Sequence, residues 1–315
     1  MRASENLLEL IGNTPMVKLT RVVDGDLEIW GKCEFMNPSG SLKDRIALYM
    51  IRAAERRGEL KPGMKILVPT TGNTGIAFAS VGAYLGYKVI IVIPEEMSYE
   101  RMLTLKAYGA EIIHTPGGES DVGRSLEYSR RMAEENPDEY YFFDQWSDEA
   151  NVQAHYETTG REILEQLGSD IDGFVAGVGT GGTLVGVAKR LKEVNPDVYV
   201  VGMEPAECPI ITTGRWGRHE IEGIGDGFVP EIINRYRHLI DDWILVSSED
   251  AIRMARRLAR EEGLFLGISS GANVVAAIRV AEEKGFKRMV TVFPDYGARY
   301  FSTRLIQEER IKRGA

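Results

Sequence analysis

Short apolar segments alternate with helical patterns along most of this chain, and this alternation limits the possible fold more than any other feature. The apolar segments are too short to span a membrane and suit buried strands. Strands that alternate with helices predict a parallel sheet whose two faces are both covered. We expect strands at 65–69, 88–94, 111–116, 140–144, 173–179, 198–205, 243–247 and 288–294, with an earlier extended stretch at 26–36.

The strand–helix pattern restarts near residue 173, and no Pro/Ser-rich linker separates the two halves. This predicts an α/β fold with two doubly wound, mostly parallel sheets that pack closely. A crevice between two such sheets is the default place for a ligand.

The composition excludes several classes of protein. A net charge of −9 argues against binding to a nucleic-acid backbone. The N-terminal stretch 1–15 carries acidic residues and no long apolar run, so we expect neither a signal peptide nor a membrane segment. Cys33 and Cys208 lie far apart without CxxC spacing. They suggest a reducing cytoplasm rather than a disulfide framework or a zinc site.

The stretch "NPSGSLKDR" (37–45) places a lysine where a turn leads into a helix. Residues 37–40 are a turn signal, and apolar residues at helical spacing follow from Leu42 to Ala54. Lys43 then lies in the first helical turn, where a cation opposes the helix dipole. A local cost of this kind sometimes marks function. The alternative is a lysine whose stem packs on the helix while its ammonium group reaches solvent.

A second loop, "TTGNTG" (70–75), follows an expected strand and opens an expected helix. Its hydroxyls, its backbone N–H groups and the amide of Asn73 can bind a carboxylate or another anion. The alternative is an ordinary turn in which a threonine caps the helix.

A third loop, "GVGTGGT" (177–183), matches GxGxxG after an expected strand, and Glu204 follows the next strand, as in a dinucleotide-binding unit. However, Thr180 and Thr183 add hydroxyls to a nest of backbone N–H groups, which suits a terminal phosphate equally well. The sequence has no GxxxxGK[ST] motif, which argues against a nucleoside triphosphatase.

The late loop "GISSGAN" (267–273) places Ser269 and Ser270 ahead of an apolar helix. A serine here can cap the helix or hydrogen-bond to a heteroaromatic nitrogen. The four histidines have no metal-ligand spacing, so a metal site has no support.

One ligand accounts for the lysine, the asparagine loop, the glycine nest and the serine together. Pyridoxal phosphate has an aldehyde, a phenolic oxygen, a phosphate and a ring nitrogen for them to bind. The chain resembles the cysteine synthase and cystathionine β-synthase family of fold type II pyridoxal-phosphate enzymes. The resemblance runs from "IGNTPMVKL" to "PDYGARYFS", and "SLKDR", "TTGNTG", "PEEMSYERMLTLKAYGAE", "GTGGT", "EGIGDGF" and "GISSG" occur in the family's order.

The resemblance implies a fold like that of the tryptophan synthase β subunit, with the cofactor in the crevice between two domains. We expect a smaller, mobile substrate-binding domain at 46–147 and a larger domain, formed by 1–45 plus 148–315, that binds the cofactor phosphate.

The resemblance also assigns roles to residues of this chain. Lys43 would hold pyridoxal 5'-phosphate and remove the α-proton, Asn73 would meet its phenolic oxygen, and Ser269 would meet its ring nitrogen. The phosphate would be bound by Gly179, Thr180, Gly181, Gly182 and Thr183. The substrate carboxylate would be bound by Thr70, Thr71, Gly72, Thr74 and Gln145.

The reaction implied is a β-replacement on an activated serine. We expect O-acetyl-L-serine and sulfide to give L-cysteine and acetate. The alternatives are a cystathionine β-synthase that joins serine or O-acetylserine to homocysteine, a serine or threonine dehydratase, and chiefly a binding partner of serine acetyltransferase. The stretch 144–160 looks closer to the cystathionine β-synthase branch, whereas "GISSGAN" looks closer to cysteine synthases. The sequence leaves the branch open.

Asp226 in "GIGDGF" lies in a loop that borders the pocket in this family. If its carboxylate faces the ligand, it disfavours O-phosphoserine as the donor by like charge. The alternative is a solvated loop carboxylate. The resemblance further implies a homodimer.

Overall fold

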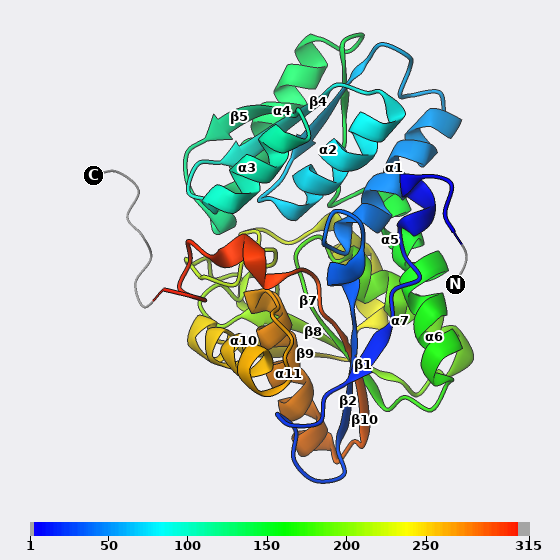
Figure 1. Cartoon of the computed structure of the whole chain (residues 1–315), viewed down its shortest axis with the longest axis vertical. Helices are drawn as coiled ribbons and strands as arrows, with labels where there is room; N and C mark the ends of the chain where they lie inside the picture. The colour runs from blue at the N-terminus through cyan, green and yellow to red at the C-terminus, as the bar shows by residue number, and fades with distance from the viewer. Residues whose placement is uncertain (1–2, 308–315) are drawn as a thin grey trace.

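The computed structural model describes residues 3–307 and shows two lobes, each built on its own sheet (Figure 1). The six-stranded sheet has the order β1-β2-β10-β7-β8-β9, and every pair except β1–β2 is parallel. Its strands are β1 (Met16–Lys18), β2 (Glu28–Lys32), β7 (Gly173–Gly177), β8 (Tyr199–Pro205), β9 (Asp242–Val246) and β10 (Arg288–Val292).

The four-stranded sheet is wholly parallel and has the order β5-β4-β3-β6. Its strands are β3 (Lys65–Pro69), β4 (Val89–Pro94), β5 (Glu111–Thr115) and β6 (Tyr140–Phe142). The helices are α1 (Lys43–Arg56), α2 (Asn73–Leu85), α3 (Tyr99–Ala107), α4 (Val122–Glu135), α5 (Glu149–Ala154), α6 (Arg161–Leu167), α7 (Gly182–Val194), α8 (Ile210–Thr213), α9 (Glu231–Tyr236), α10 (Ser248–Glu261) and α11 (Ile268–Lys284). Short 3₁₀ turns occupy Leu7–Leu10, Glu34–Met36, Glu119–Asp121, Arg237–Leu239 and Gly297–Tyr300.

Both faces of the four-stranded sheet are covered by helices. Ile66 and Ile91 pack in one hydrophobic cluster with residues of α1 and α2. Leu67 and Ile90, their chain neighbours, pack in another cluster against Met132 of α4. Because successive side chains of a strand point to opposite faces, this division requires a helix layer on each side.

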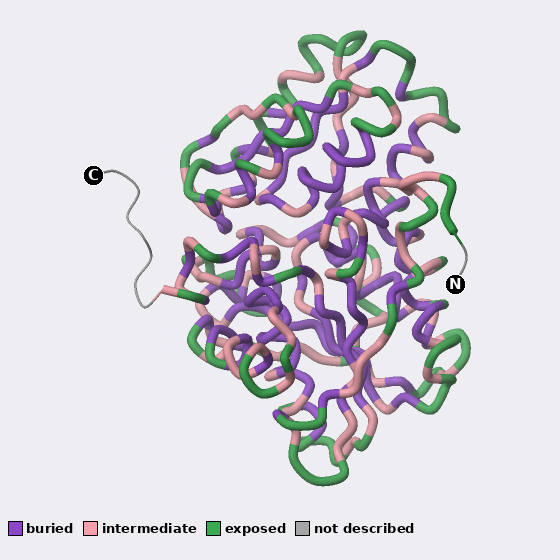
Figure 2. Tube along the Cα trace, viewed as in Figure 1, coloured by how far each residue is buried: buried purple, intermediate pink, exposed green. Residues whose placement is uncertain are grey.

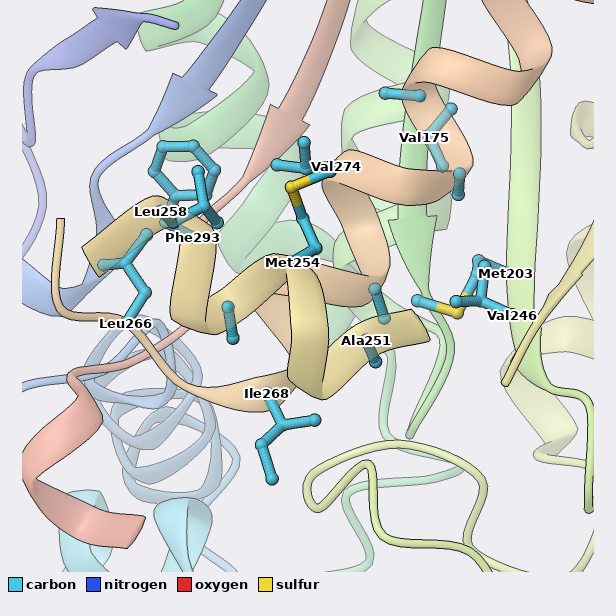
Figure 3. Packing of buried hydrophobic residues seen from close by; sticks show 14 of the residues in the cluster. Val175, Met203, Val246, Ala251, Met254, Leu258, Leu266, Ile268, Val274 and Phe293 are labelled. Carbon is cyan, nitrogen blue, oxygen red and sulfur yellow. The ribbon is translucent and has the colours of Figure 1, made fainter. Parts of the chain in front are cut away.

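The six-stranded sheet is covered in the same way. Val175 and Met203 pack against α10 and α11 on one face (Figure 3). Phe174 and Val200 pack with residues of α7 on the other. Figure 2 shows the result, with buried strands inside each lobe and exposed turns at its far ends.

The eight strands expected from residue 65 onward are present as β3–β10, so the α/β fold with two mostly parallel sheets is confirmed. The early stretch 26–36 is strand only over Glu28–Lys32, and a 3₁₀ turn follows that directs Glu34 inward to Arg45. The sequence pattern also did not predict the helical segment at 149–167. There, a π-helix at His155–Gly160 joins α5 to α6.

The predicted domain bounds, 46–147 against the remainder, stay a prediction, and α1 crosses the first of them. Within residues 3–307, no helix has both the length and the apolar character needed to cross a bilayer.

A buried ion cluster attaches the start of α1 to the six-stranded lobe. The Arg45 guanidinium donates to both oxygens of Glu34, with its Nε 2.6 Å from Oε2, and to both oxygens of Glu162, with its Nη1 2.7 Å from Oε1. Lys32 lies 2.8 Å from Glu162. All four side chains are almost wholly buried. Although burial favours the protonated acid, Arg45 and Lys32 lower the pKa of Glu162 to about 2.

Arg45→Met should destabilise the fold by about 3–5 kcal/mol, because it leaves two buried carboxylates without their shared partner. Urea unfolding followed by circular dichroism would measure the loss. The matched control is Arg257→Met on α10, which breaks an exposed pair with Glu261 and should cost less than about 1 kcal/mol. Equal losses from the two variants would contradict a central role for the buried cluster.

Candidate active site

Four helices begin at the crevice between the lobes. Their first turns contribute Lys43 from α1, Asn73 from α2, Thr183 from α7 and Ser269 from α11 to the wall of one cavity. None of the four N-termini has a side-chain cap. An uncapped N-terminus presents N–H groups and a partial positive charge. At α1 the first three N–H groups already donate to Ser41 and Leu42, so this helix contributes mainly the charge of its terminus. The cavity therefore favours a ligand with anionic groups.

A second cavity adjoins the first at Lys43. Lys43, Asn73, Gly179 and Thr180 line both cavities. Other predicted residues line one cavity only: Gly181, Thr183 and Ser269 the first, and Thr70, Thr71, Thr74 and Gln145 the second. The structure thus brings the predicted cofactor residues and the predicted carboxylate loop to two adjoining cavities that share Lys43.

Two predicted site residues, Gly72 and Gly182, do not line either cavity. A Cβ on Gly72 would collide with the side chain of Arg101, and a Cβ on Gly182 would collide with Asn151. Both glycines therefore permit close packing directly behind the site.

The Lys43 amine lies in a low-dielectric setting. Burial lowers its pKa to about 8, while the carboxylates of Asp226, Glu119 and Asp295 act in the opposite direction. A lysine with this pKa is neutral in a large fraction of molecules near pH 8. It can then act as a nucleophile or accept a proton.

The glycine nest is held in place by two side chains that the sequence analysis did not identify. Asn151 donates from Nδ2 to Thr180 Oγ1 at 2.9 Å. His155 Nε2 lies 3.1 Å from Thr183 Oγ1, and burial keeps the pKa of His155 well below its usual value. Asn151 and His155 are four residues apart, one helical turn, and this spacing was the only signal in the sequence.

The loop at residues 70–74 is shaped by its own hydrogen bonds. Thr70 Oγ1 accepts from the N–H of Gly72 at 2.9 Å. Thr74 donates to Gln145 Oε1 at 2.6 Å, and Gln145 Nε2 donates to the Pro69 carbonyl at 3.1 Å. Gln145 is thereby fixed to the end of β3, with its remaining Nε2 hydrogen available to a ligand.

Asn73 is held by the C-terminal segment. Its Nδ2 donates to Asp295 Oδ2 at 2.7 Å, and its Oδ1 accepts from Arg299. The sequence motifs did not indicate this contact, because more than two hundred positions separate the partners.

Asp226 is buried and lines the cavity of the predicted carboxylate loop. Its Oδ2 accepts from Trp146 Nε1 at 2.5 Å. Burial raises its pKa, and the Trp146 hydrogen bond and the charge of Lys43 partly offset this. The alternative of a solvated loop carboxylate is therefore wrong.

Glu204, the acid that a dinucleotide site would need, binds the first turn of α8 instead. Its two oxygens accept from the N–H groups of Ile211 at 2.7 Å and Thr212 at 3.1 Å. The donors that remain around Lys43 fit pyridoxal phosphate. The uncapped start of α7 suits a phosphate, the lysine suits an aldehyde, and a buried serine hydroxyl at the start of α11 suits a ring nitrogen.

Residues 7–295 match the family described as "Pyridoxal-phosphate dependent enzyme". The chain belongs to this family. Its cofactor is pyridoxal 5'-phosphate. A cysteine synthase of Staphylococcus aureus is 47% identical over 304 residues, which cover 96% of each chain.

Two solved structures are similar over nearly the whole chain. A cysteine synthase of Entamoeba histolytica has a TM-score of 0.90 at 37% identity, covering 100% of this chain and 93% of that one. An O-acetylserine dependent cystathionine β-synthase of Helicobacter pylori has a TM-score of 0.91 at 37% identity, covering 98% and 100%.

Cofactor-free protein should take up pyridoxal phosphate faster as the pH rises through about 8, because only the neutral Lys43 amine attacks an aldehyde. Stopped-flow absorption of the lysine-bound cofactor would give the rate at each pH. Lys43→Ala should show no such band, whereas Lys61→Ala, on the exposed surface, should match the wild type. A midpoint at the ordinary lysine pKa of 10.5 would show that burial does not activate Lys43.

Proposed function

We propose that this protein is a cysteine synthase that converts O-acetyl-L-serine and sulfide into L-cysteine and acetate. The observation that carries the proposal is the position of Lys43, between an uncapped phosphate-sized nest and a hydroxyl-rich loop at a helix N-terminus. The 47% identity to a cysteine synthase over almost the full length supports the same activity.

Each group of residues around Lys43 has its own role in the proposed reaction. When bound, pyridoxal phosphate withdraws electrons from the α-carbon of the amino acid attached to it. The start of α7, with Thr180 and Thr183, would hold its phosphate, and Lys43 Nζ would accept the α-proton. Thr70, Thr71, Thr74 and Gln145, which line the second cavity, would orient the substrate carboxylate.

The neutral hydroxyl of Ser269 bears on the type of reaction. A serine beside the ring nitrogen does not stabilise its protonated form as a carboxylate would, so the ring is a weaker electron sink. This favours prompt loss of a leaving group from the β-carbon over transamination or decarboxylation.

The first test is turnover. Purified protein loaded with pyridoxal phosphate should form cysteine from O-acetylserine and sulfide, and Lys43→Ala should form none. Protein that binds the cofactor but releases no acetate from O-acetylserine would overturn the proposal.

A second candidate is a cystathionine β-synthase that uses O-acetylserine or serine with homocysteine. The similarity to the Helicobacter pylori enzyme, at a TM-score of 0.91, favours keeping it. Parallel assays with homocysteine and sulfide separate the two. A dehydratase would instead release pyruvate or 2-oxobutyrate without a thiol, and a protein that acts chiefly by binding serine acetyltransferase would capture that enzyme's tail without turnover.

We further propose a homodimer located in the cytoplasm. The family resemblance supports the dimer. Cys33 and Cys208, both buried and unpaired, are compatible with a reducing compartment.

Asp226→Asn should raise kcat/KM for O-phosphoserine relative to O-acetylserine by about tenfold, because it removes a carboxylate that faces the donor cavity. An asparagine oxygen can still accept from Trp146. Steady-state kinetics with both donors would measure the ratio. Glu134→Gln on α4 removes an exposed charge of the same sign and is the control. An unchanged ratio in Asp226→Asn would mean that this carboxylate does not select the donor.

A further inference from the structure

The C-terminal segment Pro294–Tyr300 is attached by its backbone to two of the helices that form the site. The N–H of Leu42, just before α1, donates to the Pro294 carbonyl at 2.9 Å, and Ser41 pairs with Asp295 in an isolated bridge. The N–H of Gly267, just before α11, donates to the Asp295 carbonyl at 3.2 Å. Asp295 therefore has a fixed position where these two helices begin.

From this position, two side chains bind the amide of Asn73 on α2. Asp295, which is wholly buried, accepts from Asn73 Nδ2 at 2.7 Å. Arg299 donates to Asn73 Oδ1 and also to the Ser39 carbonyl, which fixes the guanidinium to the turn before α1. The hydroxyl of Tyr300 donates to the same Asp295 oxygen at 2.7 Å, which orients the carboxylate.

These partners allow only one orientation of the amide. A carboxylate accepts hydrogen bonds and a guanidinium donates them. Turning the amide over would place its N–H₂ against Arg299 and its oxygen against Asp295, so that both hydrogen bonds would be lost. In the observed orientation one Nδ2 hydrogen is bound by Asp295, and the second remains for the cavity that Asn73 lines.

We infer that Asp295 and Arg299 are positioning residues that make Asn73 a hydrogen-bond donor toward the ring oxygen of the cofactor. The inference rests on the proposed contact between Asn73 and that oxygen. A donated hydrogen bond stabilises the anionic form of a phenolic oxygen, whereas an amide oxygen turned toward it favours the protonated form. Asp295 and Arg299 thus set the electronic state of the cofactor without touching it.

The ratio of visible to near-ultraviolet absorption of the cofactor-loaded protein reports this state. Asp295→Leu, which has no acceptor, and Arg299→Met should each lower the ratio about three- to tenfold, the effect of one hydrogen bond on an equilibrium. Asn73→Ala should lower it at least as far. Arg299→Lys keeps a donor and should restore most of the ratio.

The control variant is Arg256→Met. Arg256 donates to the carbonyls of Arg304 and Leu305 and so also holds the C-terminal part of the chain, but it makes no contact with Asn73. It should lower the thermal unfolding temperature while leaving the absorption ratio unchanged. If it changes the ratio as much as Arg299→Met does, the effect is a general loosening and the inference fails.

A double-mutant cycle separates positioning from direct charge, because Asp295 also influences the Lys43 amine. If Asp295 acts through Asn73, then Asp295→Leu should change the ratio in the wild type but not in Asn73→Ala. An equal change in both backgrounds would overturn the inference.

The absorption spectra test the inference and turnover tests the proposed function, so each of the two can be contradicted separately. Wild-type protein that binds the cofactor but forms no cysteine contradicts the proposed function and leaves the cycle measurable. Wild-type protein that forms cysteine, with no spectral change in Asp295→Leu or Arg299→Met, contradicts only the inference.

Discussion

The buried pairing of Arg45 with Glu34 and Glu162 is the interaction on which the site depends. It lies half a helical turn after Lys43 and joins α1 to residues that follow β2 and lie on α6. A cluster of this kind gives little net stability compared with apolar packing, but its hydrogen-bond geometry permits only one arrangement. Lys43, the proposed reactive lysine, is therefore held in position by charges that take no part in the proposed reaction.

The charge of helix N-termini also explains why the candidate ligand site lies in the crevice between the lobes. Four helix N-termini without side-chain caps meet at one cavity, and the segments that carry them come from both lobes. Unpaired N–H groups are costly when they are buried. An anionic ligand removes that cost, so the fold is expected to gain stability when the cofactor is bound.

Much of the fold, and most of the residues that line the candidate site, were predictable because their signals are local. Lys43, Asn73 and Ser269 each follow a turn and open a helix, and a short stretch of sequence contains the whole pattern. Asp295 and Arg299 gave no such signal, because their significance arises only when the chain end returns to α2. Asn151 and His155 were missed because they act through the glycine nest, and the π-helix at 155–160 has no simple period in the sequence.

The position of β10 has a consequence for synthesis of the chain. Among the strands of residues 3–307 this one comes last in the chain, yet it lies inside the six-stranded sheet, between β2 and β7. The four-stranded sheet is complete once residue 142 has left the ribosome, whereas β1 and β2 join the other strands only through β10. The larger lobe must then keep two open sheet edges until β10 is made, and such edges invite pairing with other chains. Slow translation or a late truncation thus exposes the nascent larger lobe to aggregation while the smaller one folds.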